Sequence, residues 1–202
     1  MAKPKRVAVF GGAFDPPHLA HLALLEAALA HLALDELRVI PTGQAWHKSR
    51  SLSLAEHRVA MAKLAFGTLA NVIIDEREIR RPGPSYTIDT VRELQAEQPA
   101  SELFLLLGGD QARALPTWNA WQEVLTIATI CIAERPYNST ALATKDLYPW
   151  LRERFLHLPL PLSPISATDV RQRVARHEDV SPLVGPAVAR YIAQHHLYST
   201  ST

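Results

Sequence analysis

Two histidines that follow a double glycine are the residues of this chain best placed to do chemistry. Gly11 and Gly12 come directly after an apolar run at residues 7–10, and His18 and His21 follow them. Glycines lack the Cβ atoms that would keep a polyphosphate away from backbone N–H groups, so the pattern predicts a phosphate-binding turn between a strand and a helix. Because residues three apart share one face of a helix, both imidazoles can reach the same phosphate oxygens.

The residues between the glycines and the histidines fit that interpretation. Pro16 and Pro17 can begin a helix, whose positive N-terminal end would face the same phosphates. A single histidine on a helix more often caps or packs than binds a ligand. A pair at this spacing after this turn favours the phosphate role.

Two widespread nucleotide-binding motifs do not fit the sequence. A dinucleotide-binding fingerprint needs a third glycine and a carboxylate after the second strand, whereas the second apolar run here ends in Val39, Ile40 and Pro41. A P-loop needs Gly-Lys-Ser or Gly-Lys-Thr after a glycine-rich loop, and the chain has neither. A redox NAD site and a P-loop site are therefore disfavoured.

The elements that would position this turn follow an alternating rhythm. Short apolar runs alternate with helix-like segments, which predicts an α/β fold with a Rossmann-like, doubly wound parallel sheet and C-terminal helices. Strands are expected near residues 6–10, 37–40, 72–75, 103–107, 127–133 and 155–158. Helices are expected near residues 18–33, 54–66, 86–96 and 145–154, and in pieces between 110 and 126. Ligands of such sheets bind at the carboxyl ends of the strands.

Two more helices are expected in the tail. The first begins at Ser166, where Asp169 three residues later forms an approximate capping box, and the second covers about residues 186–195. The proline-rich stretch at residues 158–164 is expected to turn the chain back toward the carboxyl edge of the sheet.

Composition narrows the class of protein. A chain of 202 residues, 48% of them hydrophobic, is expected to form one domain over residues 1–202. Its 21 Lys and Arg against 20 Asp and Glu give no basic field for nucleic acid, so a small nucleotide partner is expected. The one cysteine, Cys131, lies in an apparent buried strand, which excludes a disulfide framework and a cysteine-based zinc site. No apolar run reaches membrane-spanning length, so we expect a cytoplasmic protein without a membrane partner, and a homo-oligomer is left open.

The first turn also carries a family resemblance. Its sequence from Gly11 to His21 is similar to the signature Gly-Gly-x-Phe-Asp-Pro-x-His-x-Gly-His of the His-x-x-His nucleotidyltransferases, with Ala20 in place of the last glycine. Residues 164–171 resemble that superfamily's Ile-Ser-Ser-Thr-x-x-Arg segment, with Ala167 as a second departure. The segments at 84–90 and 115–118 make the chain resemble the bacterial nicotinate-nucleotide adenylyltransferases over essentially its whole length.

The resemblance implies adenylyl transfer from ATP to nicotinate mononucleotide, giving nicotinate adenine dinucleotide and pyrophosphate in NAD biosynthesis. The attacking phosphate oxygen is already anionic, so catalysis requires in-line positioning and charge neutralisation rather than a strong base. The resemblance implies catalytic roles for His18, His21, Lys48 and Arg171. It also implies a magnesium ion carried by the ATP phosphates, with no fixed protein ligand, and a helical part at about 164–202 that completes the ATP site.

The remaining implied site residues divide between the two substrates. The implied ATP-binding residues are Gly11, Gly12, Ala13, Phe14, Asp15, Gly108, Asp110, Ile165, Ser166 and Thr168. The implied nicotinate-nucleotide-binding residues are His47, Ser85, Tyr86, Thr87, Trp118 and Asn119. The Trp118 indole is expected to stack on the pyridinium ring, and backbone N–H groups near Thr87 and Asn119 to bind the nicotinate carboxylate. Asp15 is expected to orient the turn or a substrate group.

Alternatives from other classes remain at this point. A sister transferase acting on nicotinamide mononucleotide, phosphopantetheine or glycerol phosphate would share the phosphate machinery, although Ser85 to Thr87 and Trp118 disfavour the last two. A nucleotide-sensing module without turnover is opposed by the intact histidines and cations. A transfer-RNA synthetase fragment is opposed by the near-neutral charge and the short chain.

Overall fold

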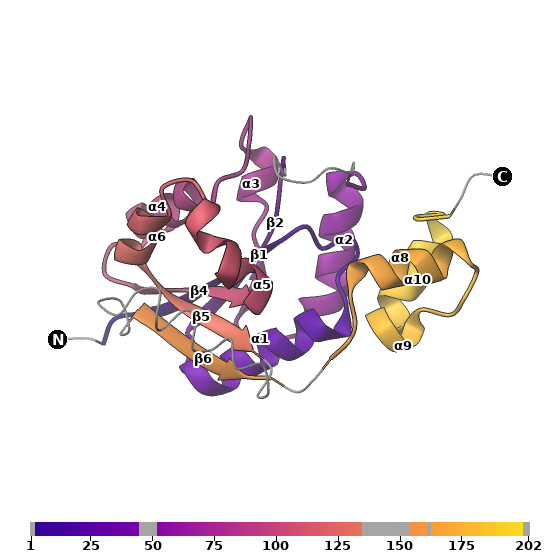
Figure 1. Cartoon of the computed structure of the whole chain (residues 1–202), viewed down its shortest axis with the longest axis horizontal. Helices are drawn as coiled ribbons and strands as arrows, with labels where there is room; N and C mark the ends of the chain where they lie inside the picture. The colour runs from indigo at the N-terminus through magenta and orange to yellow at the C-terminus, as the bar shows by residue number, and fades with distance from the viewer. Residues whose placement is uncertain (1–2, 45–51, 135–153, 161–162, 200–202) are drawn as a thin grey trace.

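A parallel sheet forms the centre of the molecule (Figure 1). The computed structural model describes residues 3–44, 52–134, 154–160 and 163–199. Its six strands lie in the order β3-β2-β1-β4-β5-β6, and every neighbouring pair is parallel. The strands are β1 Arg6–Gly12, β2 Glu36–Pro41, β3 Val72–Ile74, β4 Glu102–Gly108, β5 Ala128–Glu134 and β6 Phe155–Pro159. The predicted Rossmann-like fold is confirmed.

Helices connect and cover the strands. Those of the first half are α1 Leu19–Leu32, α2 Ala55–Phe66, α3 Arg77–Arg80 and α4 Thr87–Glu97. They are followed by α5 Gly109–Ala114, the 3-10 turn η1 Leu115–Thr117, and α6 Trp121–Ile127. The tail contains α8 Ala167–Ala175, α9 Ser181–Val184 and α10 Pro186–Gln194.

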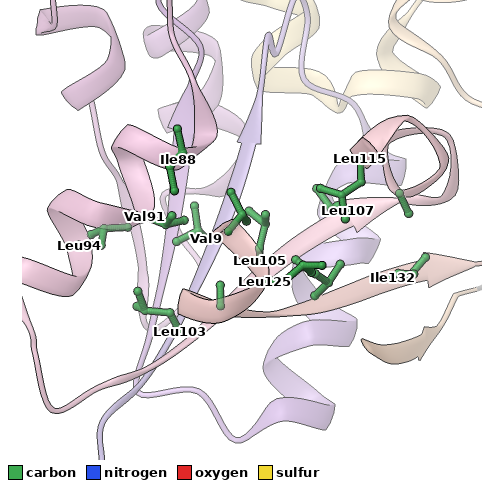
Figure 2. Close-up of a cluster of buried hydrophobic side chains, with 14 of the residues drawn as sticks. Val9, Ile88, Val91, Leu94, Leu103, Leu105, Leu107, Leu115, Leu125 and Ile132 are labelled. Carbon is green, nitrogen blue, oxygen red and sulfur yellow. The ribbon is translucent and has the colours of Figure 1, made fainter. Parts of the chain in front are cut away.

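Alternate residues of the strands supply two separate cores. Val7 and Val9 of β1 join one cluster with residues of β4, β5, α4 and α6, whereas Ala8 and Phe10 join another with residues of α1 and α2. Figure 2 shows the first cluster, in which Ile88, Val91 and Leu94 of α4 face the strand residues. Near-continuous apolar strands of this kind are typical of a parallel sheet that is buried on both faces.

The tail helices form a third cluster beside α2 (Figure 1). Met61 of α2 is fully buried there against Val170 of α8, Val184 of α9, and Val188 and Ile192 of α10. A hydrogen bond of 2.9 Å between the Tyr191 hydroxyl of α10 and His57 Nδ1 also places α10 near the start of α2.

The strand order reverses between β1 and β4. Val9 of β1 is in register with Leu105 of β4, while β1 pairs on its other side with β2. In open α/β sheets, the crevice outside such a switch point is where ligands bind. The carboxyl ends of β1 and β4 are therefore the expected place for a site.

The expected elements agree closely with the observed ones, with a few differences. The prolines do not begin α1: a cis peptide bond joins Asp15 to Pro16, and the helix begins at Leu19 with His18 as its N-cap. The short helices α3 and α9 were not anticipated, because four residues are too few to show helical periodicity. The helix expected at 145–154 lies outside the described residues except for its last residue.

The start of α8 confirms the predicted cap. Ser166 is the N-cap, and its Oγ accepts a hydrogen bond of 3.1 Å from the N–H of Asp169. The Asp169 carboxylate accepts from Arg173 Nε at 3.1 Å. The predicted burial of Cys131 is also confirmed, and burial raises the pKa of its thiol to about 12. Within the described ranges, no helix is both long and apolar enough to cross a membrane.

Candidate active site

A cavity of about 490 Å³ lies at the carboxyl ends of β1 and β4. It is lined by residues 9–13, at the end of β1 and the start of the first turn, and by residues 105–111 of β4 and α5. It is also lined by His18, His21, Leu24, Thr42, Glu78, Ser85, Tyr86, Thr87, Thr90, Trp118, Asn119 and Ile165. Residues that the sequence analysis assigned to two different substrates therefore share one cavity.

The two histidines form a stacked pair on its wall. Their ring centroids are 3.6 Å apart and their planes differ by 18°. The backbone N–H of His18 donates to Nδ1 of His21 at 3.2 Å. A neutral His21 that accepts at Nδ1 carries its proton on Nε2, so the ring can donate a hydrogen bond from that nitrogen. The rings of Phe10 and Phe14 pack against the His21 ring, with centroids 5.8 Å and 5.3 Å from it, and restrict its orientation.

Burial keeps His18 uncharged. The side chain is 8% exposed, and desolvation lowers its pKa from 6.5 to about 4. Among the described residues, its buried Nδ1 has no hydrogen-bond partner. Because a buried polar atom without a partner is costly, this nitrogen is suited to a bound polar group.

The first turn approaches the cavity without side chains. A Cβ added to Gly11 would have no atom within 4 Å, so the glycine leaves open space where a ligand can contact the backbone. A Cβ on Gly12 would meet the Phe14 ring at 3.0 Å. Ala13 lines the cavity, but the Phe14 side chain is buried in the core beneath it and does not.

Asp15 also does not line the cavity. It is 2% exposed, and its carboxylate accepts from the Tyr198 hydroxyl at 2.7 Å and from the N–H of Ser53 at 3.2 Å. Of the two expected roles for Asp15, these contacts support orienting the turn. They give no support to contact with a substrate group.

The residues expected to bind the second substrate line the cavity from the other face of the sheet, because α4 and Trp118 pack in the first core cluster whereas α1 packs in the second. Ser85, Tyr86 and Thr87 line the cavity where α4 begins, and first-turn N–H groups of a helix have no partner within that helix. The N–H of Ser85 donates to the carbonyl of Gln44 at 3.1 Å, which fixes this segment to the chain that follows β2.

The aromatic residue of this wall is Trp118, which follows η1. It is half-buried, because one side packs against the core cluster of Figure 2 while it also lines the cavity. Asn119 beside it lines the cavity and is exposed. An indole held in this way can stack on a flat ligand ring.

The β4 end of the cavity contains Gly108 and Asp110. Both line the cavity, and a Cβ on Gly108 would meet nothing within 4 Å. The Asp110 side chain is 91% exposed and pairs with Arg113 one turn later in α5.

The tail contributes Ile165 to the cavity, whereas Ser166, Thr168 and Arg171 do not line it. Arg171 Nη1 donates to the carbonyl of Asp15 at 2.8 Å, and its Nη2 donates to Thr168 Oγ1 at 3.0 Å. The guanidinium thus contacts the first turn without lining the cavity. His47 and Lys48 lie outside the described residues, and among the described lining residues the basic side chains are His18 and His21.

The cavity also contains a buried acid that was not predicted from the sequence. Glu78 of α3 is 7% exposed, accepts from the Thr90 hydroxyl at 2.8 Å, and lines the wall beside Ser85. Burial raises its pKa, while Thr90 and the charge of Arg81 oppose that effect. Its position inside a run of charged residues at 77–81 gave no sign of burial, because such a run normally indicates a solvated surface.

Arg58 of α2 is a second buried charge; the family resemblance extends over it, but it was assigned no role from the sequence. It is 2% exposed and donates to three carbonyl oxygens: Ser53 at 3.0 Å, Ala13 at 3.0 Å and Thr42 at 2.7 Å. It therefore joins the first turn to the end of β2. An arginine in the first turn of a helix is normally exposed, so its burial could not be predicted from the sequence.

Comparison with known proteins shows the family of this chain. The family model for cytidylyltransferase-like proteins matches residues 9–173. A probable nicotinate-nucleotide adenylyltransferase of Albidiferax ferrireducens is 57% identical over 197 residues, covering 98% of this chain and 100% of the relative. The chain belongs to the nicotinate-nucleotide adenylyltransferase family. It is therefore a nucleotidyltransferase.

More distant relatives agree on the family and on the fold. The probable nicotinate-nucleotide adenylyltransferase of Methylibium petroleiphilum is 44% identical over 96% of this chain and 93% of its own. Among solved structures, the nicotinic acid mononucleotide adenylyltransferase of Plasmodium falciparum complexed with NaAD has a TM-score of 0.80 at 18% identity, covering 96% of this chain and 97% of that one. A putative nicotinate-nucleotide adenylyltransferase of Vibrio parahaemolyticus has a TM-score of 0.69 at 19% identity, covering 98% and 97%. The fold of this adenylyltransferase is thus that of the family.

Proposed function

We propose that this chain transfers the adenylyl group of ATP to nicotinate mononucleotide, forming nicotinate adenine dinucleotide and pyrophosphate in NAD biosynthesis. One observation carries the proposal: both sets of residues share a cavity. His18 and His21 are on one wall, and residues 85–87 and Trp118 are on the other. One wall suits a polyphosphate and the other suits an aromatic acid. The names of the relatives agree with this division.

In this proposal, the first turn and the start of α1 bind the ATP phosphates. The open backbone at Gly11 and the N-terminal end of α1 attract anions. His21 donates from Nε2 to an oxygen of the α-phosphate, where negative charge grows as the mononucleotide phosphate attacks. His18 lies against His21 and uses its unpaired nitrogen for the same phosphates.

The leaving pyrophosphate is proposed to be bound by the side chains of Arg171 and Lys48. Arg171 is held against the first turn by the Asp15 carbonyl, and a guanidinium has several donors, so this anchoring is compatible with phosphate binding. Lys48 is proposed for the same role. Gly11, Gly12, Ala13, Gly108, Asp110 and Ile165 are proposed to bind ATP through the cavity surface, while Phe14, Asp15, Ser166 and Thr168 are proposed to support it from behind.

The second wall is proposed to bind the pyridine nucleotide. Trp118 stacks on the pyridinium ring, and N–H groups near Thr87 and Asn119 bind the nicotinate carboxylate. Ser85 and Tyr86 complete this wall, and His47 is proposed to reach the mononucleotide phosphate. Backbone donors would favour the acid over the amide, because an amide nitrogen cannot accept them.

Magnesium is proposed to enter with ATP. Within the described ranges, no group of three or more His, Cys, Asp or Glu side chains is placed to hold a metal ion. The donor set of the cavity therefore fits an ion held by phosphate oxygens, where it would neutralise charge on the triphosphate. The histidines and helix ends would then bind oxygens that the ion leaves available.

The wider assignments rest on composition and topology. We propose that residues 1–202 act as one domain and that the helical part at 164–202 completes the ATP site, as the contact of Arg171 with Asp15 suggests. The near-equal numbers of acidic and basic residues favour small nucleotides over nucleic acid as partners. A cytoplasmic location is proposed because the one cysteine, Cys131, is buried and no apolar run of the sequence reaches membrane-spanning length.

The test is a parallel assay of nicotinate and nicotinamide mononucleotides with ATP and magnesium, reading pyrophosphate. The proposal expects turnover with the acid and a much lower kcat/KM with the amide. Equal use of both would move the chain to the nicotinamide alternative. Pyrophosphate release with neither would favour the nucleotide-sensing alternative and overturn the proposal.

A further inference from the structure

The last residues of the described chain reach back to the first turn. Beyond α10, the N–H of Leu197 donates to the carbonyl of Ile192 at 3.1 Å, which folds the tail back on the helix. The next residue, Tyr198, packs beside the third core cluster and donates its hydroxyl to Asp15 Oδ1 at 2.7 Å. Residues 183 positions apart are thus joined by one hydrogen bond.

Asp15 is where several segments meet. Its other carboxylate oxygen accepts from the N–H of Ser53 just before α2, and its carbonyl accepts from Arg171 of α8. Asp15 is 2% exposed and does not line the cavity, so these contacts serve the turn itself.

Movement of Asp15 would be passed directly to the histidines. Pro16 and Pro17 separate it from His18, and each proline ring fixes the backbone φ angle. His18 in turn donates its N–H to the His21 ring. The short, stiff connection leaves little freedom between the carboxylate and the imidazole pair.

We propose that Tyr198 is a positioning residue for adenylyl transfer: its hydroxyl fixes Asp15, and through Asp15 the His18 and His21 pair, in the geometry that the ATP phosphates need. The pKa of Tyr198 is raised well above its usual value by burial and by the negative charge of Asp15. The phenol therefore remains a hydrogen-bond donor throughout the working pH range. This inference rests on the proposed function.

The chain offers a matched control. Tyr191 of α10 also hydrogen-bonds through its hydroxyl to the first turn of α2, at 2.9 Å from His57 Nδ1. Both tyrosines join the tail to the rest of the molecule, but the Tyr191 contact does not involve the turn between β1 and α1 that contains Asp15. A Tyr→Phe change removes one hydroxyl in each case and keeps the ring.

The experiment compares Tyr198→Phe, Tyr191→Phe and the unmodified chain in steady-state kinetics, well below the lowest of their melting temperatures. For Tyr198→Phe, kcat/KM for ATP should fall by about tenfold, while KM for the mononucleotide changes little. Tyr191→Phe should stay close to the unmodified chain in both parameters.

Two results would overturn the inference: an unchanged kcat/KM for ATP in Tyr198→Phe, or equal losses in both tyrosine variants, which would indicate general loosening of the tail. A purely structural role of Tyr198 would lower the melting temperature and would change the kinetic parameters for ATP and for the mononucleotide alike. If the unmodified chain turned over neither mononucleotide, the proposed function would fail, and calorimetric ATP affinities of the same three proteins would then decide the inference. A weaker affinity in Tyr198→Phe alone would support it, and equal affinities would overturn it.

Discussion

His18 and His21 stack face to face with their ring centroids 3.6 Å apart. Two charged imidazolium rings at that distance would repel each other strongly, so the stacked arrangement requires that at least one ring be neutral. Burial makes His18 that ring. The other ring, His21, accepts the His18 N–H at Nδ1 and so keeps its proton on Nε2, where it can donate to phosphate oxygens.

The buried neutral His18 predicts acid sensitivity. Its pKa is about 4 in the folded chain against 6.5 for an unperturbed histidine, so the unfolded state takes up a proton that the folded state does not. The stability that follows is present above pH 6.5 and is lost as the pH falls toward 4. Between pH 7.5 and 4.5, the native chain should lose about 2 kcal/mol more of its free energy of unfolding than His18→Gln.

Urea unfolding of both proteins at the two pH values measures this difference. Other titrating groups are shared by the two proteins and cancel in the comparison. Parallel losses in the native chain and the variant would show that His18 is not held neutral.

Gly11 and Gly12 should respond differently to alanine. A methyl group at Gly11 meets no protein atom within 4 Å, so Gly11→Ala should keep the melting temperature and raise KM for ATP by about tenfold, because the methyl group occupies ligand space. Gly12→Ala places the methyl group 3.0 Å from the Phe14 ring and should lower the melting temperature as well. Thermal melts and ATP titrations distinguish the two. An unchanged KM in Gly11→Ala would remove the first turn from the ATP site.

Trp118→Ala should separate the two substrates. The indole lines the cavity on the wall away from the histidines, so its loss should raise KM for nicotinate mononucleotide by about tenfold and leave KM for ATP nearly unchanged. Trp121 packs against the same core cluster and does not line the cavity, which makes Trp121→Ala the control for lost packing. Similar increases in both KM values for Trp118→Ala would contradict stacking on the pyridinium ring.

Much of the architecture could be read from local patterns. The apolar runs at 6–10 and 103–107 are strong signals because a central parallel strand must be apolar on both faces, and both runs form strands. The spacing of His18 and His21 was also informative, but the pair forms at the helix N-cap rather than on one helical face, because His18 precedes α1 and its N–H donates to the His21 ring. Ser166 could be recognised as a cap because its side chain acts within one turn.

Other features depend on contacts between distant parts of the chain. Glu78 and Arg58 look like surface charges along the sequence, and they are buried only because α3 and α2 pack against the end of β2 and the first turn. The contact of Tyr198 with Asp15 arises from the packing of the third cluster. Ala20, which stands where the family signature has glycine, is in the first turn of α1 and does not line the cavity.

We expect adenylyl transfer to take place in the cavity, beside the His21 imidazole. The most direct test is pyrophosphate release by His21→Ala at saturating ATP and nicotinate mononucleotide, with His31→Ala as control, because His31 is an exposed histidine in the last turn of the same helix. Loss of the imidazole should lower kcat by about a thousandfold, equivalent to ~4 kcal/mol of transition-state stabilisation, with the fold intact by circular dichroism. His31→Ala should retain the native rate. A His21→Ala variant that folds and turns over at a rate close to that of the unmodified chain would contradict the account.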